Sequence, residues 1–285
     1  MSKTWNKKSA AMLAPIPALL IGAIVMRNNN LSPLVYGQNI ICYLVFTLIL
    51  LFLGAKPVRA VRGNQVIIAM LALGCLAVAL TFLDRGLEKV HRWLALGGFR
   101  IHISSIVLPC MIIGLGELYQ KKSVIFSFVI TVIMLLMLAL QPDASQLSAF
   151  AASIAVIVWM QVKHGLLKYG VALLSVGAIT YSWIHIDSLA AVPHVEDILL
   201  LARDMGIVWF LLGIVSLALL LIPFLSFPKI SVLSRAVGLY YLVTLVSTFF
   251  GAFPVPFMGL GISPIIGYLM AVILLIRGNA DYDGV

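Results

Sequence analysis

Residues 121–143 read KKSVIFSFVITVIMLLMLALQPD, and this stretch decides the fold of the chain. It contains no charged residue between Lys122 and Asp143. An apolar helix of about 20 residues spans the hydrocarbon core of a bilayer. Lysines at one end favour the cytoplasmic side for that end, because short basic loops are rarely moved across a membrane. We therefore expect residues 123–140 to form a span that begins in the cytoplasm.

The whole 285-residue chain shares this character. Its mean hydropathy is +1.13 and hydrophobic residues make up 62% of it, whereas charged residues make up 10%, far below the ~25% of a soluble domain. We predict one integral membrane domain over residues 1–285, all-α and polytopic. About ten spans are expected, at residues 10–26, 36–54, 65–83, 103–117, 123–140, 147–162, 166–186, 205–225, 236–252 and 260–276.

The basic residues alternate correctly through the loops when both termini are placed in the cytoplasm. Thirteen of the 19 Lys and Arg residues then lie inside, namely Lys3, Lys7, Lys8, Lys56, Arg59, Arg62, Lys121, Lys122, Lys163, Lys168, Lys229, Arg235 and Arg277. Most acidic residues lie outside, namely Asp84, Glu88, Asp143, Asp187, Glu196, Asp197 and Asp204. We therefore expect any chemistry to face outward.

Several function classes are disfavoured. The net charge of +9 is mostly an orientation signal without a basic stripe interleaved with aromatic residues, which excludes nucleic acid as a partner. Cys42, Cys75 and Cys110 have neither disulfide nor metal-ligand spacing. No charged residue lies in the middle of a predicted span, which argues against a proton-coupled carrier, because such carriers use ionisable groups inside the membrane.

Three outer segments differ from ordinary connectors. HRWLALGGF at residues 91–99 places a Trp beside basic residues, a pattern that is also typical of an interfacial anchor. In Gln141-Pro142-Asp143 the proline is expected to end one helix and the aspartate to cap the next. The Pro- and Gly-rich residues 253–263 predict a non-helical break that lines a cleft, because such backbone persists at membrane depth only where protein or water satisfies it.

The outer loop with the richest set of ionisable side chains is residues 192–206, VPHVEDILLLARDMG. It predicts a short helix opened by Pro193 and closed by Gly206. Glu196 and Arg203 would share one face of that helix, and Asp197 and Asp204 the neighbouring face. The alternative is an interfacial helix whose charges are merely solvated.

In this order the four blocks resemble the SEDS family (shape, elongation, division and sporulation), whose members include the FtsW, RodA and SpoVE proteins. Residues 92–99 with Ser104 are similar to its RWI-x-LG-x-F-x-I-Q-P-S-E block, and residues 141–143 to its QPD-x-G-T-A block. Residues 193–206 are similar to its P-E-x-x-T-D-F-I-F-A-x-x-x-E-E-x-G loop, and residues 255–263 to its L-P-F-x-S-Y-G-G-S block.

The resemblance implies a ten-span glycosyltransferase that polymerises lipid II or a related lipid-linked precursor on the outer face of the bacterial cytoplasmic membrane, in cell shape or division. It implies membrane lipids as surroundings and a class B penicillin-binding transpeptidase as partner. Asp197 matches the family's catalytic aspartate and would act as the base. The substrate-binding residues implied are Arg92, Arg100, Arg203, Gln141, Asp143, Glu196, Asp204, Pro256 and Ser263, with one of the arginines stabilising the leaving diphosphate.

The chain also departs from the family pattern. His102, Ile103 and Ser105 stand where the family has Gln, Pro and Glu. Other departures are Ser145, Gln146, Gly259, Leu260 and Ile262. These changes keep open a second hypothesis, a non-catalytic relative that binds or translocates precursor or scaffolds a cell-wall synthase. A small-molecule carrier unrelated to the cell wall is the third.

No resident metal is predicted. The outer histidines His91, His102, His185 and His194, with Asp187 and Asp197 nearby, follow no recognised ligand pattern. The diphosphate of the implied reaction still leaves room for a loosely held Mg²⁺ or Mn²⁺ on the substrate.

Overall fold

A computed structural model describes residues 12–54, 63–88, 90–121, 123–225 and 231–280. The described residues are almost entirely helical, and a single two-stranded hairpin is the only sheet among them. This confirms the all-α prediction. The described residues form two compact units, which are taken here one at a time. The single domain expected over residues 1–285 stays a prediction.

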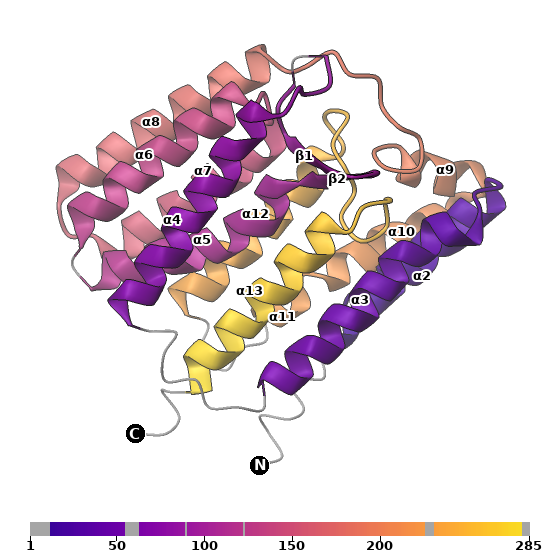
Figure 1. The fold of residues 1–285 in the computed structure, drawn as a ribbon, viewed down its shortest axis with the longest axis horizontal. Coiled ribbons are helices and arrows are strands. Elements are labelled where there is room, and N and C mark those ends of the chain that lie inside the picture. Colours follow the sequence, from indigo (N-terminus) through magenta and orange to yellow (C-terminus); the bar gives the residue numbers. More distant parts are fainter. Residues whose placement is uncertain (1–11, 55–62, 89, 122, 226–230, 281–285) are drawn as a thin grey trace. The chain divides into compact units, whose positions relative to one another are not determined.

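The first unit contains the described residues of 1–55, 189–230 and 245–285. Its helices are α2 (Ile16–Asn28), α3 (Pro33–Gly54), α9 (Ile198–Asp204), α10 (Ile207–Leu219), α11 (Ile222–Leu225) and α13 (Ser263–Ala280). Helix α3 packs against both α2 and α13, while α2 also contacts α9 and α10 (Figure 1). The short helix α9 is thereby held between two longer ones.

The second unit contains the described residues of 56–188 and 231–244. Its elements are α4 (Asn64–Leu80), the 3-10 turn η2 (Thr81–Leu83), β1 (Trp93–Leu96), β2 (Phe99–His102), α5 (Ile103–Gln120), α6 (Val124–Leu140), α7 (Ala144–Gln161), α8 (Gly165–Ile184) and most of α12 (Val232–Ser247). In helix α5, 78% of the residues are buried, whereas in the most apolar part of α8 only 17% are. Therefore α5 lies inside this unit and α8 covers its surface.

The helices coincide with the predicted spans. Within the described ranges, five helical stretches are long and apolar enough to cross a membrane, namely Asn64–Thr81, Ile103–Gln120, Ala144–Gln161, Gly165–Ile184 and Ile207–Leu225, the last of which contains α10 and α11. Shorter apolar helices stand at the other predicted positions, Ile16–Asn28, Pro33–Ile49, Val124–Leu140, Val232–Ser247 and Ser263–Arg277. The termini that we expect in the cytoplasm, with Lys3, Lys7 and Lys8, fall outside the described residues, as do Lys56, Arg59, Arg62, Lys122 and Lys229.

The expected helix boundary at Gln141-Pro142-Asp143 is confirmed. Helix α6 ends at Leu140, and the carboxylate of Asp143 accepts a hydrogen bond from the backbone N–H of Gln146 (3.1 Å) at the start of α7. Between α12 and α13 the chain is non-helical, as the Pro- and Gly-rich sequence predicts. Whether that break lines a cleft stays a prediction.

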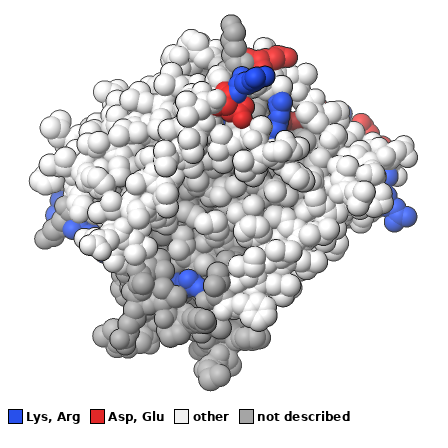
Figure 2. Space-filling model, viewed as in Figure 1, with Lys and Arg blue, Asp and Glu red and all other residues white. Residues whose placement is uncertain are grey.

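The surface is largely apolar. Side chains such as Leu34, Leu166 and Leu173 are more than three-quarters exposed. On the face shown in Figure 2 the charged side chains of the described residues are few, and they gather mainly near the top and at the sides. A surface of this kind fits lipid and would be costly in water.

One element was not predicted and one local expectation is corrected. Residues 93–102, expected as an outer segment, form an antiparallel hairpin in which Trp93 pairs with His102 and Leu96 with Phe99. Pro193 does not open α9, which begins only at Ile198. The preceding residues form a turn, because their backbone carbonyls bond to another segment.

Candidate functional site

Asp197 lies at the junction between this turn and α9, in the first unit. Its backbone carbonyl accepts a hydrogen bond from Leu201 N (3.0 Å), the first bond of the helix. Its side chain makes no capping bond and is only partly buried. No hydrogen bond or ion pair of this carboxylate is found among the described residues.

The turn beneath Asp197 is tied to the break between α12 and α13. The backbone N–H of Val255 donates to Val195 O (3.1 Å), and that of Leu260 donates to His194 O (2.9 Å). These bonds join segments some sixty residues apart in sequence. They use the carbonyls of the turn, which is why α9 does not start at Pro193.

Asn39 of α3 holds the other side of this break. Its side-chain amide donates to Gly259 O (2.8 Å) and its Oδ1 accepts from Gly261 N (3.1 Å). Asn39 is 3% exposed, so both bonds are made away from water. One buried amide therefore fixes the backbone that in turn supports the Asp197 turn.

Two glycines allow this close packing. A Cβ added at Gly22 of α2 would lie 2.2 Å from Met258 O, and one at Gly259 would lie 2.3 Å from Val195 O. Both neighbours are backbone atoms that cannot rotate away. A side chain at either position would push the segment off its support.

The other implied residues of the first unit differ in accessibility. Glu196 lies in the turn, where its Oε2 accepts from Val192 N (2.7 Å), so it does not share a helical face with Arg203 as expected. Arg203 and Asp204 are exposed at the end of α9, with Nε and Oδ1 3.9 Å apart. Pro256 and Ser263 are buried.

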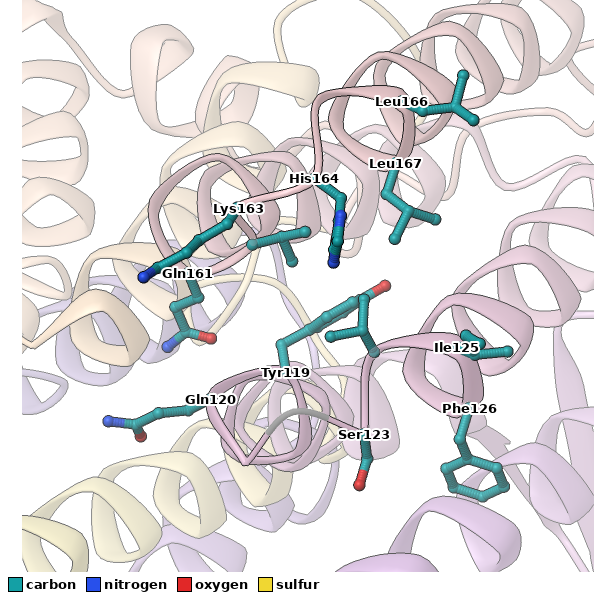
Figure 3. A pocket seen from close by; sticks show the side chains of 12 residues that line it. Tyr119, Gln120, Ser123, Ile125, Phe126, Gln161, Lys163, His164, Leu166 and Leu167 are labelled. Atoms are coloured by element: carbon teal, nitrogen blue, oxygen red, sulfur yellow. The ribbon is translucent and has the colours of Figure 1, made fainter.

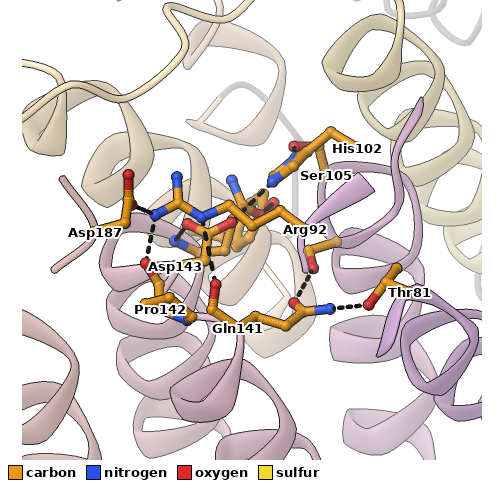
Figure 4. Close-up of polar contacts among 11 residues, drawn as sticks. Thr81, Arg92, His102, Ser105, Gln141, Pro142, Asp143 and Asp187 are labelled. Carbon is orange, nitrogen blue, oxygen red and sulfur yellow. Dashed lines mark hydrogen bonds and ion pairs between the residues drawn. The ribbon is translucent and has the colours of Figure 1, made fainter. Parts of the chain in front are cut away.

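In the second unit Arg92 is 4% exposed and is held by three groups (Figure 4). Its guanidinium forms an ion pair with Asp187 and donates to Pro142 O, and its Nε contacts Gln141 O (3.4 Å). A buried arginine is stable only when paired in this way. The guanidinium of Arg92 thus connects the start of the hairpin to the α6–α7 turn and to the segment after α8.

Gln141 is fully buried in the same network (Figure 4). The Ser104 hydroxyl donates to its Oε1 (3.0 Å), and its Nε2 donates to Thr81 Oγ1 (2.6 Å). The amide therefore links α5, the α6–α7 turn and η2. Its Nε2 and its Oε1 each bond a protein side chain.

Asp143 is 2% exposed and is bound by His102, whose Nε2 lies 2.8 Å from Oδ2. The other ring nitrogen of His102 contacts the Ser105 hydroxyl. Burial acts to raise the pKa of Asp143, but the charge of Arg92 and the hydrogen bond from His102 outweigh it, so the pKa lies below its ordinary value. His102 and Ser105, two departures from the family pattern, thus form one connected polar cluster.

Arg100 is exposed on β2, in contrast to Arg92. The hairpin that carries it is anchored by Asp84, whose carboxylate accepts from Gly86 N (3.0 Å) and Ala95 N (2.9 Å). These bonds, that of Ala95 first, lower the pKa of Asp84. Arg100 is therefore the implied cation of the second unit that remains open to a ligand.

Several residues of these clusters were not identified from sequence, namely Asn39, Thr81, Asp187 as the partner of Arg92, and Tyr240, whose hydroxyl donates to Gln146 Oε1. A polar residue inside an otherwise apolar span was the available signal for Asn39 and Tyr240. No group of three or more His, Cys, Asp or Glu side chains that could hold a metal is found within the described residues.

No protein-family model matches the chain. No curated protein matches it in sequence. Solved structures do match. The rod shape determining protein RodA of Thermus thermophilus is 14% identical, with a TM-score of 0.70 over 95% of this chain and 96% of that one. An aspartate-to-alanine variant of the same protein is 15% identical with the same score and coverage.

A chain from a peptidoglycan synthase complex, described as coordinating polymerization and crosslinking, is also similar. It is 15% identical, with a TM-score of 0.62 over 94% of this chain and 97% of that one. At such identities the likeness concerns the fold. It extends over nearly the whole chain, and this agrees with the apolar helices. The protein is thus a multi-pass membrane protein with a SEDS-like fold, the fold of RodA.

Proposed function

We propose that this chain is a membrane glycosyltransferase that polymerises a lipid II-like precursor on the outer face of the bacterial cytoplasmic membrane, in cell shape or division. The SEDS-like fold supports this proposal. The observation that carries it is the state of Asp197, a carboxylate without a side-chain partner among the described residues on a turn whose backbone is held from two sides. A general base needs a free carboxylate in a fixed position.

In the proposed reaction a sugar hydroxyl of one lipid-linked unit attacks the anomeric carbon of another. The new C–O bond forms as the bond between that carbon and the lipid diphosphate breaks. The hydroxyl proton passes to the carboxylate of Asp197, and the diphosphate leaves with the electron pair. Arg203, exposed in the same unit, supplies positive charge toward the leaving group.

We assign the residues implied in substrate binding to two roles, according to whether their side chains are exposed or buried. Arg100, Arg203 and Asp204 are exposed and are proposed to contact substrate directly. The buried members Arg92, Gln141, Asp143, Pro256 and Ser263 are proposed to shape the backbone around them. Glu196, bonded to its own turn, belongs to the supporting group.

We extend the proposal to a partner, a class B penicillin-binding transpeptidase that crosslinks the nascent strand. The support is the similarity to a chain of a peptidoglycan synthase complex. Co-purification of the full chain with such a transpeptidase from a bacterial membrane tests this part, and a transpeptidase that elutes separately at every detergent concentration would refute it.

The test of the activity is incubation of the purified full chain with labelled lipid II, followed by separation of glycan products by length. Asp197→Asn removes the base and keeps the shape, so the polymerisation rate should fall by at least about a hundredfold, the lower range for a general base. Glu88→Gln, an exposed acid of another outer loop, is the matched control and should keep the rate.

Two results would contradict the proposal. Polymer formation by Asp197→Asn at the rate of the unmodified chain excludes Asp197 as the base. If the unmodified chain binds lipid II without forming polymer, the non-catalytic alternative, a SEDS-like protein that binds or translocates precursor or scaffolds a synthase, replaces the enzymatic one. Circular dichroism of each variant checks that the helices are retained.

A further inference from the structure

The second unit contains a cavity of about 1020 Å³ (Figure 3). The cavity lies at the ends of α5 to α8 that are opposite to the Arg92 cluster. It is formed by the turn between α5 and α6 and the turn between α7 and α8. The positive-inside pattern predicts that this end is cytoplasmic. The volume is at the upper end of the range for small-molecule sites.

Lys163 gives the cavity wall a positive charge beside the neutral side chains of Gln120 and Ser123 (Figure 3). The described residues offer Lys163 no acidic partner. The first turns of α6 and α8 also line it, and neither contains an acidic residue or has a side-chain cap. The unpaired N–H groups and positive dipole ends of two helices thus add to the charge of Lys163.

Gln161 supplies an unsatisfied acceptor in the same wall. Its Oε1 is buried and has no hydrogen-bond partner among the described residues. Such atoms are rarely left unpaired, because each costs free energy. A ligand that carries hydroxyl donors next to a negative charge would satisfy both Gln161 and the cationic groups.

The surroundings place the cavity at the depth of the lipid headgroups. Trp159 and Tyr169 are exposed and pack edge to face at 6.2 Å, and Lys168 Nζ lies 5.2 Å from the Trp159 ring. Exposed Trp and Tyr beside Lys mark the membrane interface. Ile125 and Leu166, at the rim of the cavity, are 77% and 88% exposed and fit acyl chains.

We propose that this cavity binds the headgroup of an anionic phospholipid. The phosphodiester lies at the two helix N-termini beside Lys163, the headgroup hydroxyls bond Gln161 Oε1, and the acyl chains run over Ile125 and Leu166. Free phosphate shares the charge of this ligand but lacks the chains. The proposal does not depend on the glycosyltransferase activity, since it concerns other residues of the chain.

The test is native mass spectrometry of the delipidated full chain, titrated with phosphatidylglycerol or phosphatidylcholine of the same chain length. Phosphatidylglycerol should bind more tightly. Lys163→Gln should weaken its binding about fivefold, the factor that one basic residue near an anionic surface contributes. Lys121→Gln is the matched control, since Lys121 lies at the same end, outside the cavity wall, and donates to Asn64 Oδ1 (3.2 Å).

A second variant, Leu167→Trp, narrows the cavity without changing its charge and should also weaken the binding of phosphatidylglycerol. Equal affinity for both lipids, or equal weakening by Lys163→Gln and Lys121→Gln, would overturn the proposal. Displacement of the lipid by an equal concentration of inorganic phosphate would overturn it too, because the site would then recognise the free anion.

Discussion

Replacement of Asn39 by alanine tests the support of the Asp197 turn directly. The change removes the donor to Gly259 O (2.8 Å) and the acceptor from Gly261 N (3.1 Å). Gly259 is buried, so its unpaired carbonyl should cost about 1.5 kcal/mol, whereas Gly261 is half-buried and should cost about 0.5 kcal/mol. We expect a total loss of about 2 kcal/mol in the free energy of unfolding.

The assay is thermal unfolding of the purified chain in detergent, followed by circular dichroism. A loss of about 2 kcal/mol corresponds to a fall in Tm of roughly 4 to 8 °C for a chain of this size class. Hydrogen exchange should rise in peptides that cover residues 253–263 and 192–197, because the two segments are bonded to each other. Peptides from α5 should exchange as before.

Gln38→Ala is the control, since the side chain of this half-buried neighbour makes no hydrogen bond among those described. The reasoning is refuted if Asn39→Ala lowers Tm by less than 1 °C, or if Gln38→Ala lowers it as much. An unchanged exchange rate over residues 253–263 would show that the break is held by other contacts.

Two further outcomes are expected. The pKa of Asp143 lies below its ordinary value in the fold, so the ionised carboxylate contributes its full stabilisation above the unfolded pKa of about 3.9 and loses it as the pH falls through the folded pKa. Tm measured from pH 6 down to pH 2.5 should therefore decrease below pH 4. The Asp143→Asn variant should show a smaller decrease. Gly22→Ala should lower the free energy of unfolding by about 1 to 3 kcal/mol, because the added Cβ would contact Met258 O. Gly37→Ala, with open space around it, is the control and should not lower Tm. Equal Tm values for the two variants would disprove the close approach of α2 to Met258.

The buried polar clusters change how the departures from the family pattern are interpreted. His102 and Ser105 bond to each other, and His102 also bonds Asp143. Polar groups in a low-dielectric interior must be satisfied together, so a change at one position requires a matching change at its neighbour. The two departures at His102 and Ser105 therefore satisfy each other and Asp143 inside the fold.

The sequence by itself determined the membrane spans, the cap at Asp143 and the break between α12 and α13. Each of these depends on neighbours within one helix length: an apolar run long enough to cross the bilayer, a proline that ends a helix, and a carboxylate next to free N–H groups. Such signals can be identified one segment at a time, so the spans were found within a few residues.

Only the tertiary structure decided which polar groups meet. Asn39 and Gly259 are 220 residues apart in sequence, and Arg92 and Asp187 are 95 apart. The same packing moved Glu196 off the predicted helical face, because the carbonyls of His194 and Val195 bond the 255–260 segment. A buried hydrogen bond needs its partner within about 3 Å, and helix packing sets that distance, which no local pattern in the sequence contains.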